Sequence, residues 1–200
     1  MKKAAKFALI KTIPIFLGYL FLGIAFGLLL QKSGLGVFWA FLISTLVYAG
    51  SMQFALVGIL TGGLSYVTTA VMTLFINSRH AFYGLTFIER FKEMRKTYPY
   101  MVFSLTDETY SLLCSMARPS DFTDREWKAA TFFTSFFDQC YWIAGSVLGA
   151  LMGELITFDT TGIDFAMTAL FVVICVDQWK AAKTHIPAVT GFICGALFLV

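Results

Sequence analysis

The stretch Ser33–Ser78, "SGLGVFWAFLISTLVYAGSMQFALVGILTGGLSYVTTAVMTLFINS", contains no Asp, Glu, Lys, Arg or His. As one continuous helix it would measure roughly 70 Å. The hydrocarbon core of a bilayer is only about 30 Å thick. This stretch therefore contains enough chain for two passes through a membrane, and its length decides the fold class.

The composition of the whole chain agrees with a membrane protein. Its 200 residues are 58% hydrophobic and 14% charged, whereas soluble domains average about 45–50% apolar and about 25% charged residues. Strands of a membrane barrel would be about ten residues long with alternating polarity, and the apolar segments here are longer and do not alternate. We predict an all-α integral membrane protein, a single transmembrane transport domain over residues 1–200, with about five to seven membrane segments. The apolar segments fall at 13–30, 37–61, 63–88, 100–117, 129–152, 163–178 and 186–200.

Positive charges predict the orientation of the first segments. Four lysines precede segment 13–30, which is too long for the apolar region of a secretory signal and is read as a retained helix. The positive-inside rule places these lysines in the cytoplasm, and with them the basic loop Glu89–Lys96, "ERFKEMRK". The chain must then cross the membrane an odd number of times between Ser33 and Leu85. An even number of crossings with a weak charge bias is the alternative.

The uncharged stretch has one obvious interruption, Tyr48–Gln53, "YAGSMQ". Unwound backbone at membrane depth is tolerated where it lines a cavity or is buried in protein. In transporters, broken helices present free N–H and C=O groups to the substrate. We predict a re-entrant or broken helix at 49–53, with 37–48 entering and 53–61 returning.

A weak internal repeat is visible at an offset of 122 residues. The sequence "GYLFLGIAFG" (18–27) resembles "CYWIAGSVLG" (140–149), which predicts repeat halves at about 13–88 and 129–200. Both contain a Gly-x-x-x-Gly pair that would let helices approach closely. The chain ends in "GFICGALFLV" without a polar flank, so we expect a truncated C-terminus.

The sequence "FINSRHAFYGL" (75–85) places polar residues inside an apolar run. On a helix, Asn77, Arg79, His80 and Tyr83 share one side and could face a common cavity. Arg79 offers a bidentate donor for a carboxylate, and His80 could relay a proton. In the alternative, the helix ends earlier and Arg79 reaches the membrane surface.

Three acidic residues lie in apolar surroundings. Asp107 and Glu108 are adjacent in "SLTDETYSL", and Asp138 lies about ten residues into segment 129–152. Arg79 is the natural partner for one of the adjacent acids, and the other could take protons. A charge at the membrane centre costs about 2.5–3.5 kcal/mol, so Asp138 is a candidate for a proton relay. The alternatives are an interfacial segment with both adjacent acids in water, and a neutral structural Asp138.

Enzyme and cofactor sites find little support. No P-loop, zinc motif or dinucleotide fingerprint is present, and a serine-protease reading of Gly50-Ser51 lacks the further glycines that it needs. The four cysteines have no Cys-x-x-Cys spacing, which disfavours disulfide and metal roles. The net charge of +3 lies mostly in tails and loops, so nucleic acid is not an expected partner. We predict no enzyme, no cofactor and no metal.

Four motifs, taken in order, resemble one known family. They are "PIFLGYLFLGIAFG", "LVYAGSMQFALVGIL", "INSRHAFYGL" and "SLTDETYSL", and together they resemble the AzlC-like branched-chain amino acid permeases. Ser78 is a mild departure, because the family usually has "NLRH" here. The resemblance implies the large subunit of an AzlC/AzlD-type exporter: a multi-pass plasma-membrane protein with a cytoplasmic N-terminus. It would move valine, leucine, isoleucine and methionine together with a small AzlD-like membrane subunit.

A zwitterionic substrate needs a cation or a helix N-terminus for its carboxylate, and an acid or carbonyl groups for its amine. The predicted substrate-binding residues are Tyr48, Gly50, Ser51, Gln53, Asn77 and Arg79. The predicted proton or charge relay comprises His80, Asp107, Glu108 and Asp138. The alternatives are a channel, a structural membrane subunit that does not transport, or a transporter of another small zwitterion.

Overall fold

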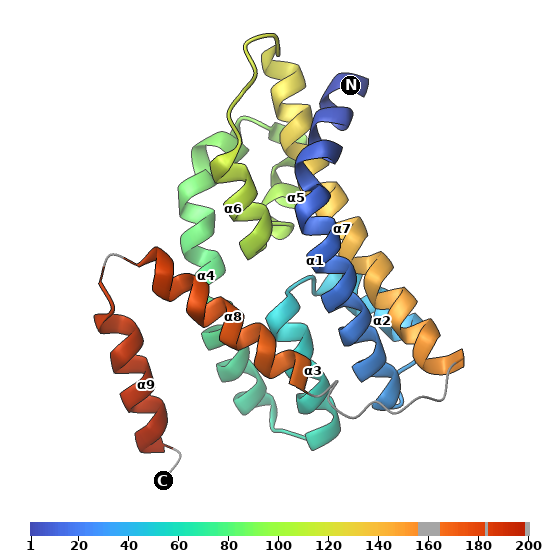
Figure 1. Ribbon diagram of the computed structural model, residues 1–200, viewed down its shortest axis with the longest axis vertical. Helices are drawn as coiled ribbons and strands as arrows, with labels where there is room; N and C mark the ends of the chain where they lie inside the picture. The colour runs from blue at the N-terminus through green and yellow to red at the C-terminus, as the bar shows by residue number, and fades with distance from the viewer. Residues whose placement is uncertain (156–164, 183, 199–200) are drawn as a thin grey trace.

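The computed structural model describes residues 1–155, 165–182 and 184–198, and every regular element in these ranges is helical (Figure 1). The helices of the first part are α1 (Lys2–Lys32), α2 (Val37–Leu46), α3 (Gly50–Gly62) and α4 (Tyr66–Lys92). A short 3-10 helix, η1 (Arg95–Thr97), leads into α5 (Tyr98–Phe103) and α6 (Asp107–Ser115). The last helices are α7 (Asp124–Leu155), α8 (Phe165–Ala181) and α9 (Ile186–Phe198). The predicted all-α class is confirmed.

Helices α1 and α7 lie side by side and parallel along most of their length (Figure 1). Near their first residues, Lys3 Nζ of α1 lies 2.8 Å from Oδ2 of Asp121, which precedes α7 by three residues. In the middle Gly23 faces Gly145, and Gly27 faces Gly149. The two glycine pairs that the sequence singled out therefore meet in step, and the absence of side chains brings the two backbones together.

Helices α2 and α3 form a hairpin with an interruption at its tip. The predicted interruption is present, but it lies at Val47–Ala49, and residues 50–53 already form the first turn of α3. Tyr48 has a φ of 40°, a left-handed conformation that is uncommon outside glycine. The sharp turn is therefore made by Tyr48, two residues before Gly50.

The predicted apolar segment 100–117 is divided between two helices. It is interrupted at Ser104–Thr106, which separates α5 from α6. The Thr106 hydroxyl accepts a hydrogen bond from the Thr109 N–H at 3.3 Å and so caps the start of α6. The adjacent acids Asp107 and Glu108 thus stand in the first turn of a new helix, where carboxylates are favourable.

The two hairpins enter the molecule from opposite ends. One end of the molecule holds the N-terminus, the end of α4 and the α6–α7 loop, joined by the ion pairs Lys3–Asp121 and Lys128–Glu93. The α5–α6 hairpin enters from this basic end, and the α2–α3 hairpin enters from the other (Figure 1). Their tips meet in the middle, where the Tyr48 and Phe103 rings lie 6.2 Å apart. At the exposed basic end, hydrogen bonding to Lys3 lowers the pKa of the Asp121 carboxyl below its usual value.

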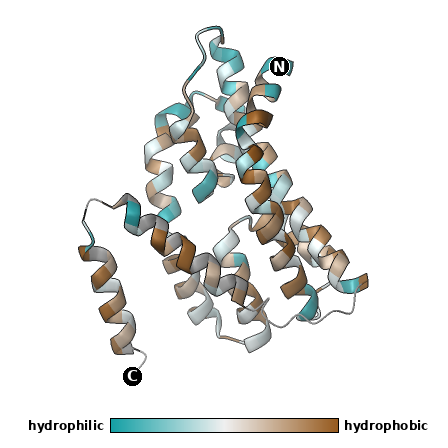
Figure 2. Cartoon of the chain, viewed as in Figure 1, coloured by the Kyte–Doolittle hydropathy of each residue, from teal (hydrophilic) through white to brown (hydrophobic). Residues whose placement is uncertain are grey.

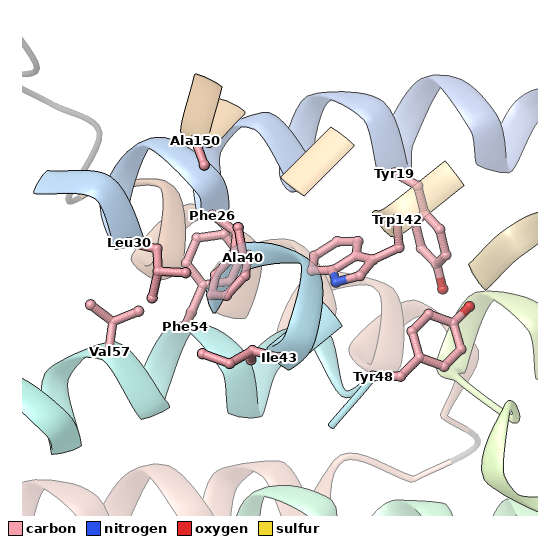
Figure 3. Close-up of a cluster of buried hydrophobic side chains, with 10 residues drawn as sticks. All are labelled: Tyr19, Phe26, Leu30, Ala40, Ile43, Tyr48, Phe54, Val57, Trp142 and Ala150. Carbon is pink, nitrogen blue, oxygen red and sulfur yellow. The ribbon is translucent and has the colours of Figure 1, made fainter. Parts of the chain in front are cut away.

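A cluster of buried apolar side chains fixes the α2–α3 hairpin against the α1–α7 pair (Figure 3). Phe26 of α1 lies between Phe54 of α3 and Trp142 of α7, with ring centroids 5.7 and 6.4 Å away. Tyr19 packs edge-on against Trp142 at 5.3 Å. This core holds the hairpin tip at a fixed height along α1 and α7.

Many large apolar side chains are exposed on the outside of the molecule, and hydrophobic residues recur along its helices (Figure 2). Phe21 is 81% exposed and Phe75 is 75% exposed, as expected of surfaces that face lipid or another subunit. Among the described residues, α1 is the helix long and apolar enough to span a bilayer by length and composition alone. The number of crossings stays a prediction, and the predicted segment 163–178 and the repeat half 129–200 lie partly outside the described residues.

Candidate functional site

A small polar cavity lies where the two hairpin tips meet. Its volume is about 30 Å³, and since one water needs about 10–15 Å³, it has room for about two waters. Seven of the ten predicted site residues line it: Tyr48, Gly50, Ser51, Arg79, His80, Asp107 and Glu108. Segments far apart in the sequence, 48–51, 79–80 and 107–108, thus converge on one point.

Arg79 joins both hairpins to α4. Its Nη2 atom donates to Ser51 Oγ at 2.7 Å and lies 2.9 Å from Asp107 Oδ2. The pairing of Arg79 with one of the adjacent acids is the one that the sequence predicted. The side chains of Arg79 and Asp107 are 24% and 25% exposed. Other parts of the protein therefore cover most of the surface of this ion pair.

Several polar atoms around the cavity are buried without a partner among the described residues. They include Arg79 Nε, Asp107 Oδ1 and the Tyr48 hydroxyl. Buried polar groups nearly always have hydrogen-bond partners in native proteins. One donor, one carboxylate acceptor and one hydroxyl are therefore available to a bound molecule.

Two helix N-termini meet at the cavity and differ in charge. The first turn of α6 carries Asp107 and Glu108, whereas the first turn of α3 contains no acidic residue. The two carboxylates therefore neutralise the partial positive charge at the N-terminus of α6, whereas the partial positive charge at the N-terminus of α3 has no acidic residue beside it in its own first turn. Gly50 lets α3 begin close to α7, since a Cβ there would lie 3.3 Å from the Trp142 ring. The cavity therefore has a positive side at Arg79 and α3 and a negative side at the acids of α6.

Gln53 was predicted to bind substrate, and the structure places it outside the cavity lining. Its side chain is fully buried and both ends of its amide are used. Gln53 Oε1 accepts from Trp142 Nε1 at 2.8 Å, and Gln53 Nε2 donates to Ser44 Oγ at 3.3 Å. The amide thus connects α2, α3 and α7.

Asn77 and Asp138 also lie outside the lining. Asn77 Oδ1 is buried without a partner among the described residues, and the Asn77 carbonyl oxygen lies 3.2 Å from His80 Nδ1. Asp138 is fully buried between α6 and α7, where its Oδ2 accepts from Thr109 Oγ1 at 2.8 Å. The predicted relay therefore falls into two parts, with Glu108 at the cavity and Asp138 behind it.

Helix α7 also connects the entering halves of both hairpins. Gln139 Nε2 donates to the Thr45 carbonyl oxygen of α2 at 3.2 Å, and the Tyr100 hydroxyl of α5 donates to Gln139 Oε1 at 2.8 Å. The Thr45 carbonyl belongs to the last turn of α2, so it has no partner within its own helix. One glutamine thus ties the last turn of α2 to α5.

Four lining residues were not predicted as site residues: Tyr19, Leu22, Thr106 and Trp142. Two of them carried a signal in the sequence. Tyr19 is the aromatic residue of the internal repeat, and Thr106 precedes two acids in the pattern of a helix N-cap. Leu22 and Trp142 add an apolar wall, which nothing local in the sequence distinguishes from packing.

Comparison with known proteins places this architecture in one family. The family model described as AzlC protein matches residues 14–156. The "Branched-chain amino acid transport protein AzlC" of Bacillus subtilis is 37% identical over 90% of this chain and 70% of its own length. An uncharacterized membrane protein of Helicobacter pylori is 37% identical over 98% of this chain and 86% of its own length.

A third relative, an uncharacterized membrane protein of Haemophilus influenzae, is 34% identical over 99% of this chain and 80% of its own length. No solved structure is significantly similar to this chain. The matched residues contain α1 from Pro14 onward, all of α2 to α7 and every residue that lines the cavity. Together with its apolar surface, these relatives identify the chain as a membrane protein, and it belongs to the AzlC family.

Proposed function

We propose that the chain is the large subunit of a secondary transporter that exports valine, leucine, isoleucine and methionine across the plasma membrane. The name of the Bacillus subtilis relative supports a branched-chain amino acid as the substrate. The cavity between two broken helices supports a transporter, since such sites are typical of secondary transporters.

The observation that carries the proposal is the separation of charge across the cavity. Arg79 Nε and the uncompensated α3 N-terminus suit a carboxylate. Glu108 and the free oxygen of Asp107 suit an ammonium group on the opposite side. A zwitterionic amino acid carries both groups a few ångströms apart, so it would satisfy both sides at once.

The size of the cavity supports a carrier that changes conformation. With about 30 Å³ the cavity admits waters but no branched-chain amino acid, so the hairpins must move apart for binding. Arg79 bridges the two tips through Ser51 and Asp107. A substrate carboxylate that competes for Arg79 would loosen this bridge, which would couple binding to movement.

The apolar wall suggests broad selectivity. Leu22 and Trp142 line the cavity and offer no hydrogen bond that would fit one side chain only. One methylene in such a pocket changes binding by about 1–3 kcal/mol. The transporter should therefore accept valine, leucine, isoleucine and methionine with overlapping affinities.

The basic end of the molecule predicts its orientation in the membrane, and its exposed apolar surface supports assembly with a partner subunit. The positive-inside rule favours a cytoplasmic location for the basic end, and with it the N-terminus. The small AzlD-like subunit implied by the family resemblance is a proposed partner, and exposed side chains such as Phe75 and Phe82 offer apolar surface for it. Co-purification from membranes tests this assembly.

Export of valine, isoleucine and methionine from dipeptide-loaded cells tests the function. Wild type and Arg79→Ala are compared at matched expression, each together with the proposed small AzlD-like subunit. Arg125→Ala is the matched control, since Arg125 is exposed on the first turn of α7. We expect rapid efflux from wild type and Arg125→Ala, and a loss of at least about tenfold in Arg79→Ala, since a buried charge-assisted contact contributes about 1.5–3 kcal/mol.

Other outcomes separate the competing functions. Wild-type efflux no faster than that of empty cells would reject export of these amino acids and favour another zwitterion or a structural role. Efflux without saturable counterflow would indicate a channel. Full efflux from Arg79→Ala would keep the function and remove Arg79 from the substrate site.

A further inference from the structure

A continuous line of hydrogen bonds joins two of the acidic side chains through three hydroxyl groups. The Tyr19 hydroxyl lies 2.8 Å from Glu108 Oε2 and 2.6 Å from Thr106 Oγ1. Thr106 Oγ1 lies 3.1 Å from Thr109 Oγ1, which lies 2.8 Å from Asp138 Oδ2. We call these five side chains the hydroxyl chain.

The hydroxyl chain leads from the cavity into the protein interior. Glu108 and Tyr19 line the cavity, whereas Thr109 and Asp138 are 0% exposed and lie outside its lining. The three helices that contribute, α1, α6 and α7, come from distant parts of the sequence. Such a line between two acids is more than local capping requires, since Thr106 alone already caps α6.

The number of protons in the hydroxyl chain is fixed by its hydrogen bonds. Four links join the five groups, and each link needs one proton. Tyr19, Thr106 and Thr109 have one hydroxyl proton each, which leaves one link without a donor. One of the two carboxyl groups must therefore be protonated when all four links are present.

Two arrangements satisfy this count. With the extra proton on Glu108, every hydroxyl donates toward Asp138, which is ionised. With the proton on Asp138, every hydroxyl donates toward Glu108, which is ionised. We propose that the hydroxyl chain holds one proton between Glu108 and Asp138 and passes it between them during transport, which rests on the transport function proposed above.

The transfer is balanced in atoms and charge. Glu108 gives its proton to Tyr19, whose own proton passes to Thr106. In the same way Thr106 passes one to Thr109, and Thr109 passes one to Asp138. Four O–H bonds break and four form along the four links. One negative charge moves from Asp138 to the cavity.

Several other ionisable groups face the hydroxyl chain. Asp107 and Arg79 lie beside Glu108 and are paired with each other. Tyr48 and Tyr100 lie near Asp138, and His80 lines the cavity from α4. A substrate ammonium group in the cavity would favour the ionised form of Glu108 and drive the proton toward Asp138, which links substrate binding to proton position.

Infrared spectroscopy tests the shared proton without any transport. The purified protein at neutral pH should show the carbonyl band of a protonated carboxyl group. The band should be absent from the double variant Glu108→Gln/Asp138→Asn and present in Asp107→Asn. A wild type without the band, or a band that persists in the double variant, overturns the inference whatever the protein transports.

Transport in proteoliposomes tests the use of the proton, with the protein reconstituted as it is purified from the membrane. Thr109→Val removes a hydroxyl outside the cavity and interrupts the hydroxyl chain. Valine flux driven by a pH gradient should fall at least about tenfold, while valine exchange between equal concentrations continues. Thr109→Ser, which restores the hydroxyl, should recover the driven flux.

Thr134→Val is the matched control, because Thr134 is equally buried but donates to Ala130 within its own helix. Its driven flux should equal that of wild type. Driven flux in Thr109→Val equal to that of wild type would overturn the proton path and leave the transporter intact. Absence of valine exchange by the wild type would instead reject the proposed function. The infrared experiment would still show whether Glu108 and Asp138 hold a proton between them.

Discussion

Gln53 shows how a polar side chain can support a site that it does not line. Its amide lies between Trp142 and Ser44, in a region without exposed surface. A polar residue beside a helix break can either contact a ligand or form hydrogen bonds that hold the two half-helices against neighbouring helices. The structure assigns Gln53 the second kind of position.

Replacement of Gln53 tests this structural role. In Gln53→Leu the Trp142 N–H is left buried without an acceptor, and the free energy of unfolding should fall by about 1–3 kcal/mol. Thermal unfolding in detergent, followed by circular dichroism, measures the loss. The KM for valine exchange should stay at the wild-type value, since Gln53 does not line the cavity.

Gln31→Leu is the control, because the side-chain oxygen Gln31 Oε1 has no hydrogen-bond partner among the described residues. Its unfolding midpoint should stay near that of wild type. A Gln53→Leu protein of wild-type stability with a strongly raised KM would show that Gln53 binds substrate after all.

Part of the site could be predicted residue by residue. An arginine and two acids in apolar surroundings must find partners, which is why the Arg79–Asp107 pair could be anticipated. The hydroxyl chain could not, because Tyr19, Thr106 and Thr109 are ordinary residues by type and become significant only through their positions between two acids. Sequence spacing gives the faces of one helix, but not which faces of three helices meet.

At the scale of elements, the two helix interruptions show which signals can be read. The break was predicted at 49–53 from a glycine and polar neighbours, whereas it lies at Val47–Ala49, where Tyr48 makes the turn. The break at Ser104–Thr106 contains neither glycine nor proline. Its signal was the N-cap pattern of a threonine followed by two acids, "TDE", which also marks a helix start.

The contact between α1 and α7 gives a sharp test at this scale. A Cβ at Gly27 would lie 2.5 Å from Ala150 N, whereas a Cβ at Gly18 would have nothing within 4 Å. We expect Gly27→Ala to push the helices apart and lower stability by about 1–3 kcal/mol or more. Gly18→Ala, on the same helix, should be neutral or slightly stabilising, since alanine favours helix.

Thermal unfolding of the two variants in the same detergent makes the comparison. Gly149→Ala should behave like Gly27→Ala, because its Cβ would lie 2.7 Å from Ile24 Cα. Equal midpoints for Gly18→Ala and Gly27→Ala would show that the parallel packing of α1 and α7 is wrong.

At the scale of the whole molecule, average hydropathy understates the membrane character of the chain. Helix α7 is long but less apolar than α1, and its polar residues Ser135, Asp138 and Gln139 are buried. These residues lower the average hydropathy of α7 although their side chains are inside the protein. Such polar interiors are expected of helices that surround a transport site.

The opposite entry of the two hairpins predicts which loops reach each side of the membrane. In a background without the four native cysteines, a single cysteine is placed at Leu64 or at Ser120, both exposed. Leu64 lies between α3 and α4, and Ser120 lies in the α6–α7 loop of the basic end. With the basic end in the cytoplasm, an impermeant maleimide should label Leu64→Cys in intact cells and Ser120→Cys only after permeabilisation.

The labelling pattern separates the possible topologies because each places the two positions differently. If α4 makes one full crossing, as predicted, the α3–α4 loop and the basic end lie on opposite sides of the membrane, and so do the two positions. Labelling of both from the same side would support the even-crossing alternative and break the path that the hairpins form. The reverse pattern would keep the architecture but invert its orientation, and the acids at the tip of α5–α6 would then be reached from outside the cell.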